Sequence, residues 1–206
     1  MGTVTTGDLF RTFGPAIEDF YRKLCAAAEK MRGVAFVFAL GASVPVKLDE
    51  DGRITEIFDG VRVPANCTAA VRVDQLQVLE RASVFVTHCG MNSCSESLSK
   101  TVPVVAVPFF GDQIENAERF EELGCGVVQR YTQGYHFSSQ WNPDYSRITE
   151  DSLASAIGSI LNDPSYSTAI KALYDDVMEE CGAPIQEKID GMLKFADSAQ
   201  QGGIFA

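Results

Sequence analysis

The sequence predicts an α/β domain built on a doubly wound parallel sheet. Short apolar runs alternate along the chain with longer segments in which apolar residues recur every three to four positions. Continuous apolar runs are typical of strands buried on both faces of a parallel sheet, and strands that alternate with helices indicate βαβ units. The chain has 206 residues, 46% of them hydrophobic, which suits one domain over residues 1–206.

The first half of the chain opens with an amphipathic pattern. The three-to-four spacing predicts a helix from Phe10 to Met31, ended by Gly33. The polar, acidic stretch from Lys47 to Gly60 predicts a loop or hairpin, and its triplet Asp49-Glu50-Asp51 is expected to be a solvated turn and not a metal site. The remaining elements expected here are strands at Val34–Leu40 and Cys67–Val71 and a helix at Asp74–Arg81.

The second half continues the alternation and ends in helices. We expect strands at Val84–Thr87, Pro103–Val107 and Gly126–Gln129, and helices from Ser93 and over Asp112–Leu123. A polar stretch at about 131–147 lacks periodicity and is expected to be a loop insertion. C-terminal helices are expected at about 150–197, as Glu150–Leu161, Pro164–Glu180 and Ala183–Ala196.

The start of the chain departs from this plan. It begins Met1-Gly2-Thr3 and enters its first helix after a few polar residues. Doubly wound domains ordinarily begin with a strand, so we expect the first strand of this sheet to be missing from the chain.

Composition excludes several classes of function. The formal net charge is −11, and a nucleic-acid surface would need a basic face, so no nucleic-acid partner is expected. No run of about 20 apolar residues is present to span a membrane. The six cysteines contain no Cys-x-x-Cys pair, which is typical of free thiols in a reducing compartment. We therefore expect a cytoplasmic location and no metal site. An anionic small molecule remains possible, because the N–H groups at a helix start bind phosphate without cations.

The residues best suited to such a ligand follow two predicted strands. The first strand ends at His88, and the chain turns at Gly90 into a helix that carries Asn92, Ser93 and Glu96. Ligands of open α/β sheets bind outside the carboxyl ends of strands. Donors at a helix start suit a diphosphate, and a carboxylate one turn later suits a vicinal diol such as ribose.

The next strand is followed by Asp112 and Gln113, whose side chains suit sugar hydroxyls. A structural alternative stays open for both helices, because Ser93-x-x-Glu96 and Asp112-x-x-Glu115 also match the capping box. His88 could equally be a half-buried structural histidine.

The stretch from Arg72 to Ala117 resembles the signature of family 1 glycosyltransferases, the UDP-dependent enzymes with a GT-B fold. That signature runs Trp-x-Pro-Gln, His-Cys-Gly-Trp-Asn-Ser-x-x-Glu-Ser, Gly-Val-Pro and Asp-Gln-x-x-Asn-Ala. Gly2-Thr3 resembles the glycine loop after the first strand of the C-terminal, Rossmann-like domain. Four positions depart from the signature: Arg72 and Met91 replace the tryptophans, Asp74 the proline and Thr101 the glycine.

The resemblance implies a role for each matching position. His88 would contact the α-phosphate, while Gly90, Asn92, Ser93 and the backbone of Met91 would hold the diphosphate. The ribose would be bound by Glu96, with Gln75 nearby, and the donor sugar by Asp112 and Gln113. Arg72 would stack on the base, since a guanidinium plane can replace an indole there.

The resemblance further implies a hexosyltransferase that inverts the anomeric carbon without metal, with a UDP-sugar as co-substrate and no cofactor. The acceptor, a small-molecule hydroxyl, and the catalytic histidine would belong to an N-terminal domain supplied in cis or in trans. No catalytic residue is therefore expected in this chain, which we expect to be inactive alone. The alternatives are a stand-alone subunit, as in the two-protein enzyme that extends dolichol-linked sugars, a non-catalytic nucleotide-sugar-binding subunit, or a truncated fragment that needs a partner for activity.

Overall fold

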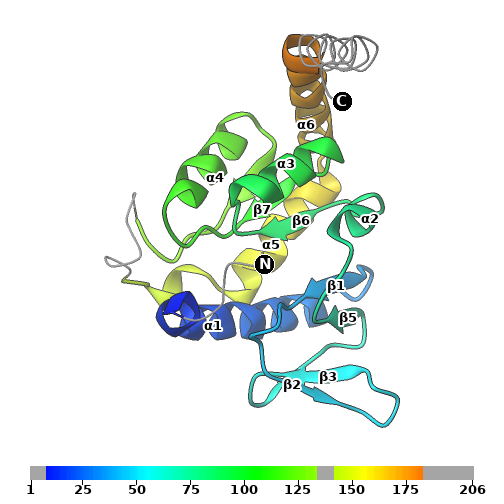
Figure 1. Ribbon diagram of the computed structural model, residues 1–206, viewed down its shortest axis with the longest axis vertical. Helices are drawn as coiled ribbons and strands as arrows, with labels where there is room; N and C mark the ends of the chain where they lie inside the picture. The colour runs from blue at the N-terminus through cyan, green and yellow to red at the C-terminus, as the bar shows by residue number, and fades with distance from the viewer. Residues whose placement is uncertain (1–7, 134–141, 183–206) are drawn as a thin grey trace, which may run out of the picture.

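The computed structural model describes residues 8–133 and 142–182 and contains three small sheets joined by helices and loops (Figure 1). Two of the sheets are parallel, with strand orders β1-β5 and β6-β7-β8, and the third is an antiparallel set, β2-β3-β4. The α/β class is confirmed. The expectation of one continuous parallel sheet is wrong for the described residues, because the two parallel sheets do not pair with each other.

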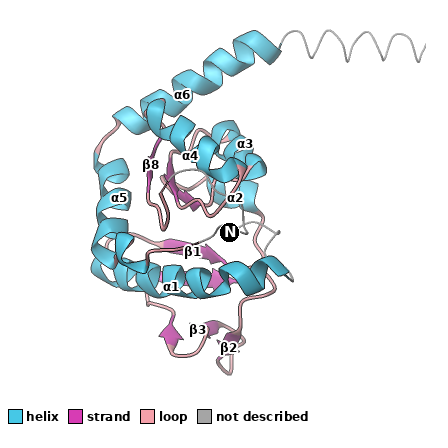
Figure 2. Cartoon of the chain, turned by 90° about the vertical axis from the view of Figure 1, so that its left-hand side faces the viewer, coloured by secondary structure: helices cyan, strands magenta, loops and turns pink. Residues whose placement is uncertain are grey.

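The first helix, α1 (Asp8–Lys30), covers the β1-β5 sheet and packs against α5 (Glu150–Asn162) (Figures 1 and 2). Its face buries Phe13, Ile17, Phe20 and Leu24, which is the three-to-four spacing of the prediction. These side chains form much of the main hydrophobic core.

The strand that follows, β1 (Phe36–Ala39), pairs in parallel with β5 (Cys67–Ala70), with Phe36 opposite Cys67. We predicted that β1 would be buried on both faces. Phe38 is buried, but the side chain of Val37 is 51% exposed, so that part of the prediction is wrong. The reason is that β1 pairs only along its β5 edge among the described strands.

The predicted hairpin at residues 47–60 is a three-stranded meander of β2 (Val46–Leu48), β3 (Ile54–Ile57) and β4 (Val61–Arg62). Asp49 shapes its first turn, since its Oδ1 accepts hydrogen bonds from the N–H groups of Asp51 (3.0 Å) and Arg53 (2.8 Å). The acidic triplet is therefore a turn, as predicted.

The second parallel sheet carries the signature residues. It consists of β6 (Phe85–Thr87), β7 (Val104–Ala106) and β8 (Gly126–Val128). The central strand β7 is buried at every position. A second core gathers beneath α3 (Met91–Ser99), α4 (Asp112–Glu122) and α6 (Ser165–Val177), around Ala106, Ala117 and Ile170.

The other helical elements are α2 (Gln75–Leu79), a 3₁₀ turn at Tyr145–Arg147 and a π turn at Met178–Gly182. The predicted loop at 131–147 is anchored at its start, where the buried Tyr131 hydroxyl donates to Asp19 Oδ2 at 2.8 Å. The predicted helix at Ala183–Ala196 and the question of a missing first strand fall on residues outside the described ranges, so both stay predictions. No described helix has the length and apolarity needed to cross a bilayer.

A stability prediction follows from the packing of β8 on β7. A Cβ on Gly126 would lie 2.5 Å from the carbonyl oxygen of Val104, so Gly126→Ala forces the two strands apart. We expect a loss of about 1–3 kcal/mol in the free energy of unfolding, or roughly 2–4 °C in melting temperature per kcal/mol. The control is Gly33→Ala, since a Cβ there has nothing within 4 Å. Equal melting temperatures for the two variants would contradict this packing.

Candidate functional site

The candidate site begins where β6 ends and α3 starts. His88, Cys89 and Gly90 form the turn, and Gly90 is the N-cap of α3. Because glycine has no side chain, no cap satisfies the first turn. The N–H groups of Met91, Asn92 and Ser93 have no acceptor within the described part of the chain. These orphan donors lie at the positive end of the helix dipole, where an anion is favoured.

His88 packs directly on this turn. A Cβ on Gly90 would lie 2.7 Å from His88 Nε2, so glycine is the residue that lets the ring sit there. Burial lowers the pKa of His88 to about 4, although the Asp112 carboxylate opposes that effect. The ring is therefore neutral at pH 7. Its buried Nδ1 has no hydrogen-bond partner among the described residues, and a buried polar atom of this kind calls for a partner.

The capping-box alternative is wrong for both helices. Ser93 lies inside the first turn of α3, with Gly90 as N-cap, and α4 is preceded by Gly111, which makes no side-chain cap. Gly111 has φ +61° and ψ −137°, a conformation that favours glycine. The Ser93 hydroxyl, though its residue is only 6% exposed, makes no hydrogen bond within the described residues. It is thus available to a ligand.

The start of α4 lies beside the same turn because β6 and β7 are parallel neighbours. Asn116 makes the link: its Nδ2 donates to the carbonyl of Cys89 at 3.0 Å and to Asp112 Oδ2 at 3.3 Å. Sequence reasoning did not select Asn116. Its position one turn after Asp112, inside the signature, was the available signal.

Asp112 and Gln113 differ in their surroundings. Asp112 is exposed. Gln113 is buried, and its Oε1 accepts hydrogen bonds from the N–H groups of Phe109 (3.0 Å) and Phe110 (3.4 Å). Gln113 thereby holds the loop between β7 and α4, and its amide nitrogen makes no hydrogen bond with the described residues.

Two further predicted residues reach the site from the segment after β5. Gln75, the first residue of α2, donates from Nε2 to the Glu96 carboxylate, so these two predicted neighbours are in contact. Asp74 caps α2 by accepting from Gln77 N–H at 3.1 Å, which accounts for an aspartate where the signature has proline. Arg72 is exposed two residues after β5, and its side chain makes no hydrogen bond or ion pair with the described residues.

The site is therefore a cluster of donors at two helix starts, with carboxylates at Glu96 and Asp112. Nearly all predicted residues meet at the carboxyl edge of the β6-β7-β8 sheet, and Arg72 lies on the adjoining loop. Such an arrangement can bind a diphosphate at the α3 start and hydroxyl groups at the carboxylates.

Comparisons with known proteins show which family the chain belongs to. The family described as UDP-glucoronosyl and UDP-glucosyl transferase matches residues 71–176, just over half of the chain. The chain is 32% identical over 141 residues to the ecdysteroid UDP-glucosyltransferase of Lymantria dispar multicapsid nuclear polyhedrosis virus, covering 68% of this chain and 24% of that protein. It is 30% identical over 165 residues to the NDP-glycosyltransferase YjiC of Bacillus subtilis (strain 168), covering 80% and 36%.

Solved structures show the same likeness. The glycosyltransferase of kitacinnamycin aligns with a TM-score of 0.60 at 28% identity, covering 79% of this chain and 36% of that one. The calicheamicin glycosyltransferase CalG4 shares the fold, with a TM-score of 0.62 at 22% identity over 86% and 38%. This chain thus spans 24–38% of the length of these glycosyltransferases. It belongs to the UDP-glycosyltransferase family and forms a domain of the GT-B type.

Proposed function

We propose that this chain is the donor-binding part of a hexosyltransferase. It binds a UDP-sugar, and the sugar passes to the hydroxyl of a small-molecule acceptor that is held by an N-terminal domain outside this sequence. The observation that carries the proposal is the uncapped start of α3. Three N–H groups that have no acceptor among the described residues lie there with the Ser93 hydroxyl, and the ring of His88, whose Nδ1 has no partner among those residues, packs against Gly90.

Each part of the donor has a matching group. The diphosphate lies on the start of α3 against His88 and Gly90, and the ribose diol is bound by Glu96, which Gln75 orients. The donor sugar meets Asp112, oriented by Asn116, and the amide of Gln113. Arg72, exposed and without a described partner, stacks on the uracil.

The chemistry assigned to this chain is stabilisation of the leaving group. As the glycosidic bond to the diphosphate breaks, negative charge grows on the phosphate oxygens, and oriented N–H groups at α3 stabilise it without metal. In-line attack by the acceptor inverts the anomeric carbon, with the base supplied by the N-terminal domain. We also propose a cytoplasmic location, supported by six cysteines that are all unpaired.

Nucleotide binding tests the site directly. UDP at about 100 times its Kd stabilises the fold by about 2.7 kcal/mol, or roughly 5–10 °C in melting temperature. Ser93→Ala removes a hydrogen bond to a charged group and weakens UDP binding about tenfold. Ser95→Ala is the matched control, because the Ser95 hydroxyl already donates to Met91 O within the helix. A folded protein whose melting temperature no nucleoside diphosphate changes would exclude the site.

A second prediction concerns the charge on His88. In the free protein His88 stays neutral down to about pH 4, whereas the histidine of the unfolded chain takes up a proton near pH 6.5. The free energy of unfolding therefore falls as the pH is lowered from 6.5 toward 4. A diphosphate bound to the ring favours the imidazolium, so saturating UDP raises the pKa of His88. An NMR pH titration of the ring measures this, and His88→Gln identifies its signal among the two histidines. An unchanged midpoint would remove His88 from the phosphate site.

A third prediction is that the chain binds donor without transferring sugar. Positioning and deprotonation of the acceptor supply several kcal/mol of the barrier, and both tasks belong to the N-terminal domain. A donor-consumption assay with phenolic, sterol and macrolide acceptors measures turnover by the chain alone and with an added N-terminal domain. Robust transfer by the isolated chain would show that the base lies within these 206 residues.

A further inference from the structure

Two buried cysteines lie at the turn that carries the proposed phosphate site. Cys89 directly precedes Gly90, the N-cap of α3, and Cys94 is the fourth residue after that cap. Side chains at these two positions commonly pack together at the start of a helix. Cys89 is fully buried and Cys94 is 7% exposed, and both belong to the core beneath α3. Two thiols therefore meet where two apolar side chains would serve the packing equally well.

The two thiols are in contact and differ in reactivity. Cys94 Sγ donates to the carbonyl oxygen of Cys89 at 3.4 Å, and the two side chains also hydrogen-bond to each other. That hydrogen bond lowers the pKa of Cys94 and raises the pKa of Cys89, while burial raises both. Cys94 is thus the more acidic and the more exposed of the two thiols. Because the thiolate is the form that oxidants attack, oxidation begins at Cys94.

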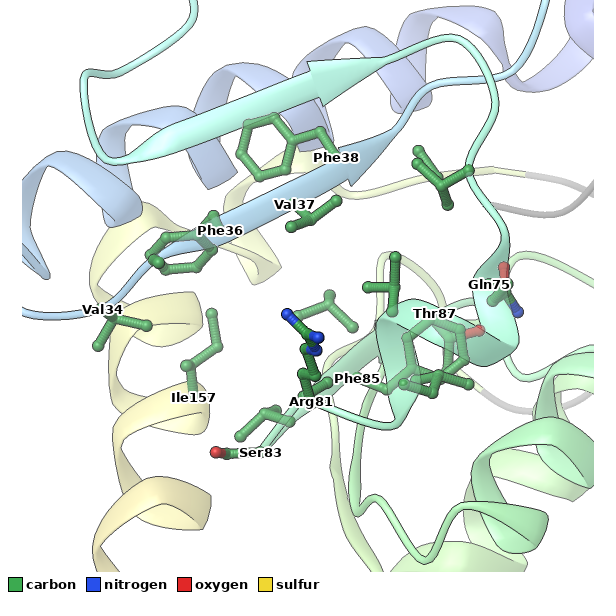
Figure 3. A pocket seen from close by; sticks show the side chains of 18 of the residues that line it. Val34, Phe36, Val37, Phe38, Gln75, Arg81, Ser83, Phe85, Thr87 and Ile157 are labelled. Carbon is green, nitrogen blue, oxygen red and sulfur yellow. The ribbon is translucent and has the colours of Figure 1, made fainter.

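The backbone of Cys89 is held on both sides. Its carbonyl also accepts from Asn116 Nδ2 at 3.0 Å, and its N–H donates to Thr87 Oγ1 at 3.3 Å. Its φ of +59° lies in the left-handed region, which a residue with a side chain rarely adopts. Thr87 also lines a cavity of about 1220 Å³ between the stretch from Gly33 to Ala39, which includes β1, and the stretch from Ser83 to Thr87 (Figure 3). A movement of Cys89 therefore has to displace the turn together with its links to β6 and α4.

We propose that Cys89 and Cys94 form a redox-sensitive site, at which hydrogen peroxide closes a disulfide and thereby weakens nucleotide binding. Peroxide is the oxidant that suits this place, because a sulfur with so little exposed surface is reached only by a small molecule. The effect on binding rests on the proposed function, whereas formation of the disulfide does not.

The oxidation consumes one peroxide for each disulfide. The Cys94 thiolate attacks one peroxide oxygen, the O–O bond breaks and hydroxide leaves, which gives a sulfenic acid at Cys94. The Cys89 sulfur then attacks the Cys94 sulfur and displaces the second oxygen as hydroxide. The two thiol protons convert both hydroxides to water. Two thiols are thus oxidised to a disulfide while one peroxide is reduced to two water molecules.

Closing the disulfide alters the proposed phosphate site in two ways. The bond draws the two sulfurs to about 2.05 Å, closer than two thiols in contact, and so pulls the turn toward α3. It also removes the S–H group that donates to the Cys89 carbonyl. The first N–H groups of α3 follow this turn directly, so their alignment with a diphosphate changes. Loss of one hydrogen bond to a charged group lowers the affinity for UDP about tenfold.

The first test maps the thiols of the full chain after treatment with peroxide. Alkylation and mass spectrometry of peptides should show Cys89 and Cys94 joined by a disulfide that dithiothreitol reverses. Cys94→Ser should lose this disulfide, although its hydroxyl keeps a donor for the Cys89 carbonyl. The control is Cys125→Ala, because Cys125 is fully buried in the same core and donates to Leu123 O at 3.6 Å. This variant should keep the disulfide.

The second test measures UDP binding by the reduced and the oxidised protein. Oxidation should weaken binding about tenfold in the parent chain and in Cys125→Ala, and should leave the affinity of Cys94→Ser unchanged. By linkage, saturating UDP should raise the reduction potential of the pair by about 30 mV, which is the same tenfold change.

Three outcomes would overturn the proposal: free thiols at Cys89 and Cys94 after peroxide, a disulfide that joins other cysteines, or equal UDP affinity of the two forms. Failure of the reduced protein to bind UDP would contradict the proposed function together with the effect on binding. The thiol map would still decide whether the disulfide forms.

Discussion

The contact of the His88 ring with Gly90 is the constraint on which the rest of the site depends. Since no Cβ fits between the ring and the turn, α3 begins without a capping side chain, and its first N–H groups have no acceptor among the described residues. Burial keeps the ring neutral by lowering its pKa. The fold thus forgoes a capping side chain at the start of α3, and this leaves the N–H groups there available to an anion.

Asn116 extends this constraint to the second helix. By donating to Cys89 O and to Asp112 Oδ2, it ties the start of α4 to the turn before α3. Gln113 restrains the preceding loop through Phe109 and Phe110. The groups that we propose for the phosphates and the sugar are therefore held together at one edge of the sheet, which matters because catalysis tolerates little error in position.

The cavity between β1 and β6 lies where the observed strands depart from one continuous doubly wound sheet. Among the described strands β1 pairs only with β5 and β6 only with β7, so no described strand joins the two parallel sheets. The exposure of Val37 is the local consequence. Thr87 lines this cavity and directly precedes His88, so the cavity adjoins the proposed donor site.

Local patterns in the sequence predict most helices and strands, and the signature predicts which residues to expect at the donor site. Three-to-four spacing predicts α1, apolar runs predict the strands, and Gly90, Ser93 and Asp112 predict the phosphate and sugar edge, because these patterns depend on near neighbours in the chain. Tertiary contacts were needed to show how the strands join, that Ser93 and Asp112 do not cap their helices, and that Asn116 bridges the two helix starts. Those outcomes depend on contacts between segments far apart in sequence, which no local pattern records.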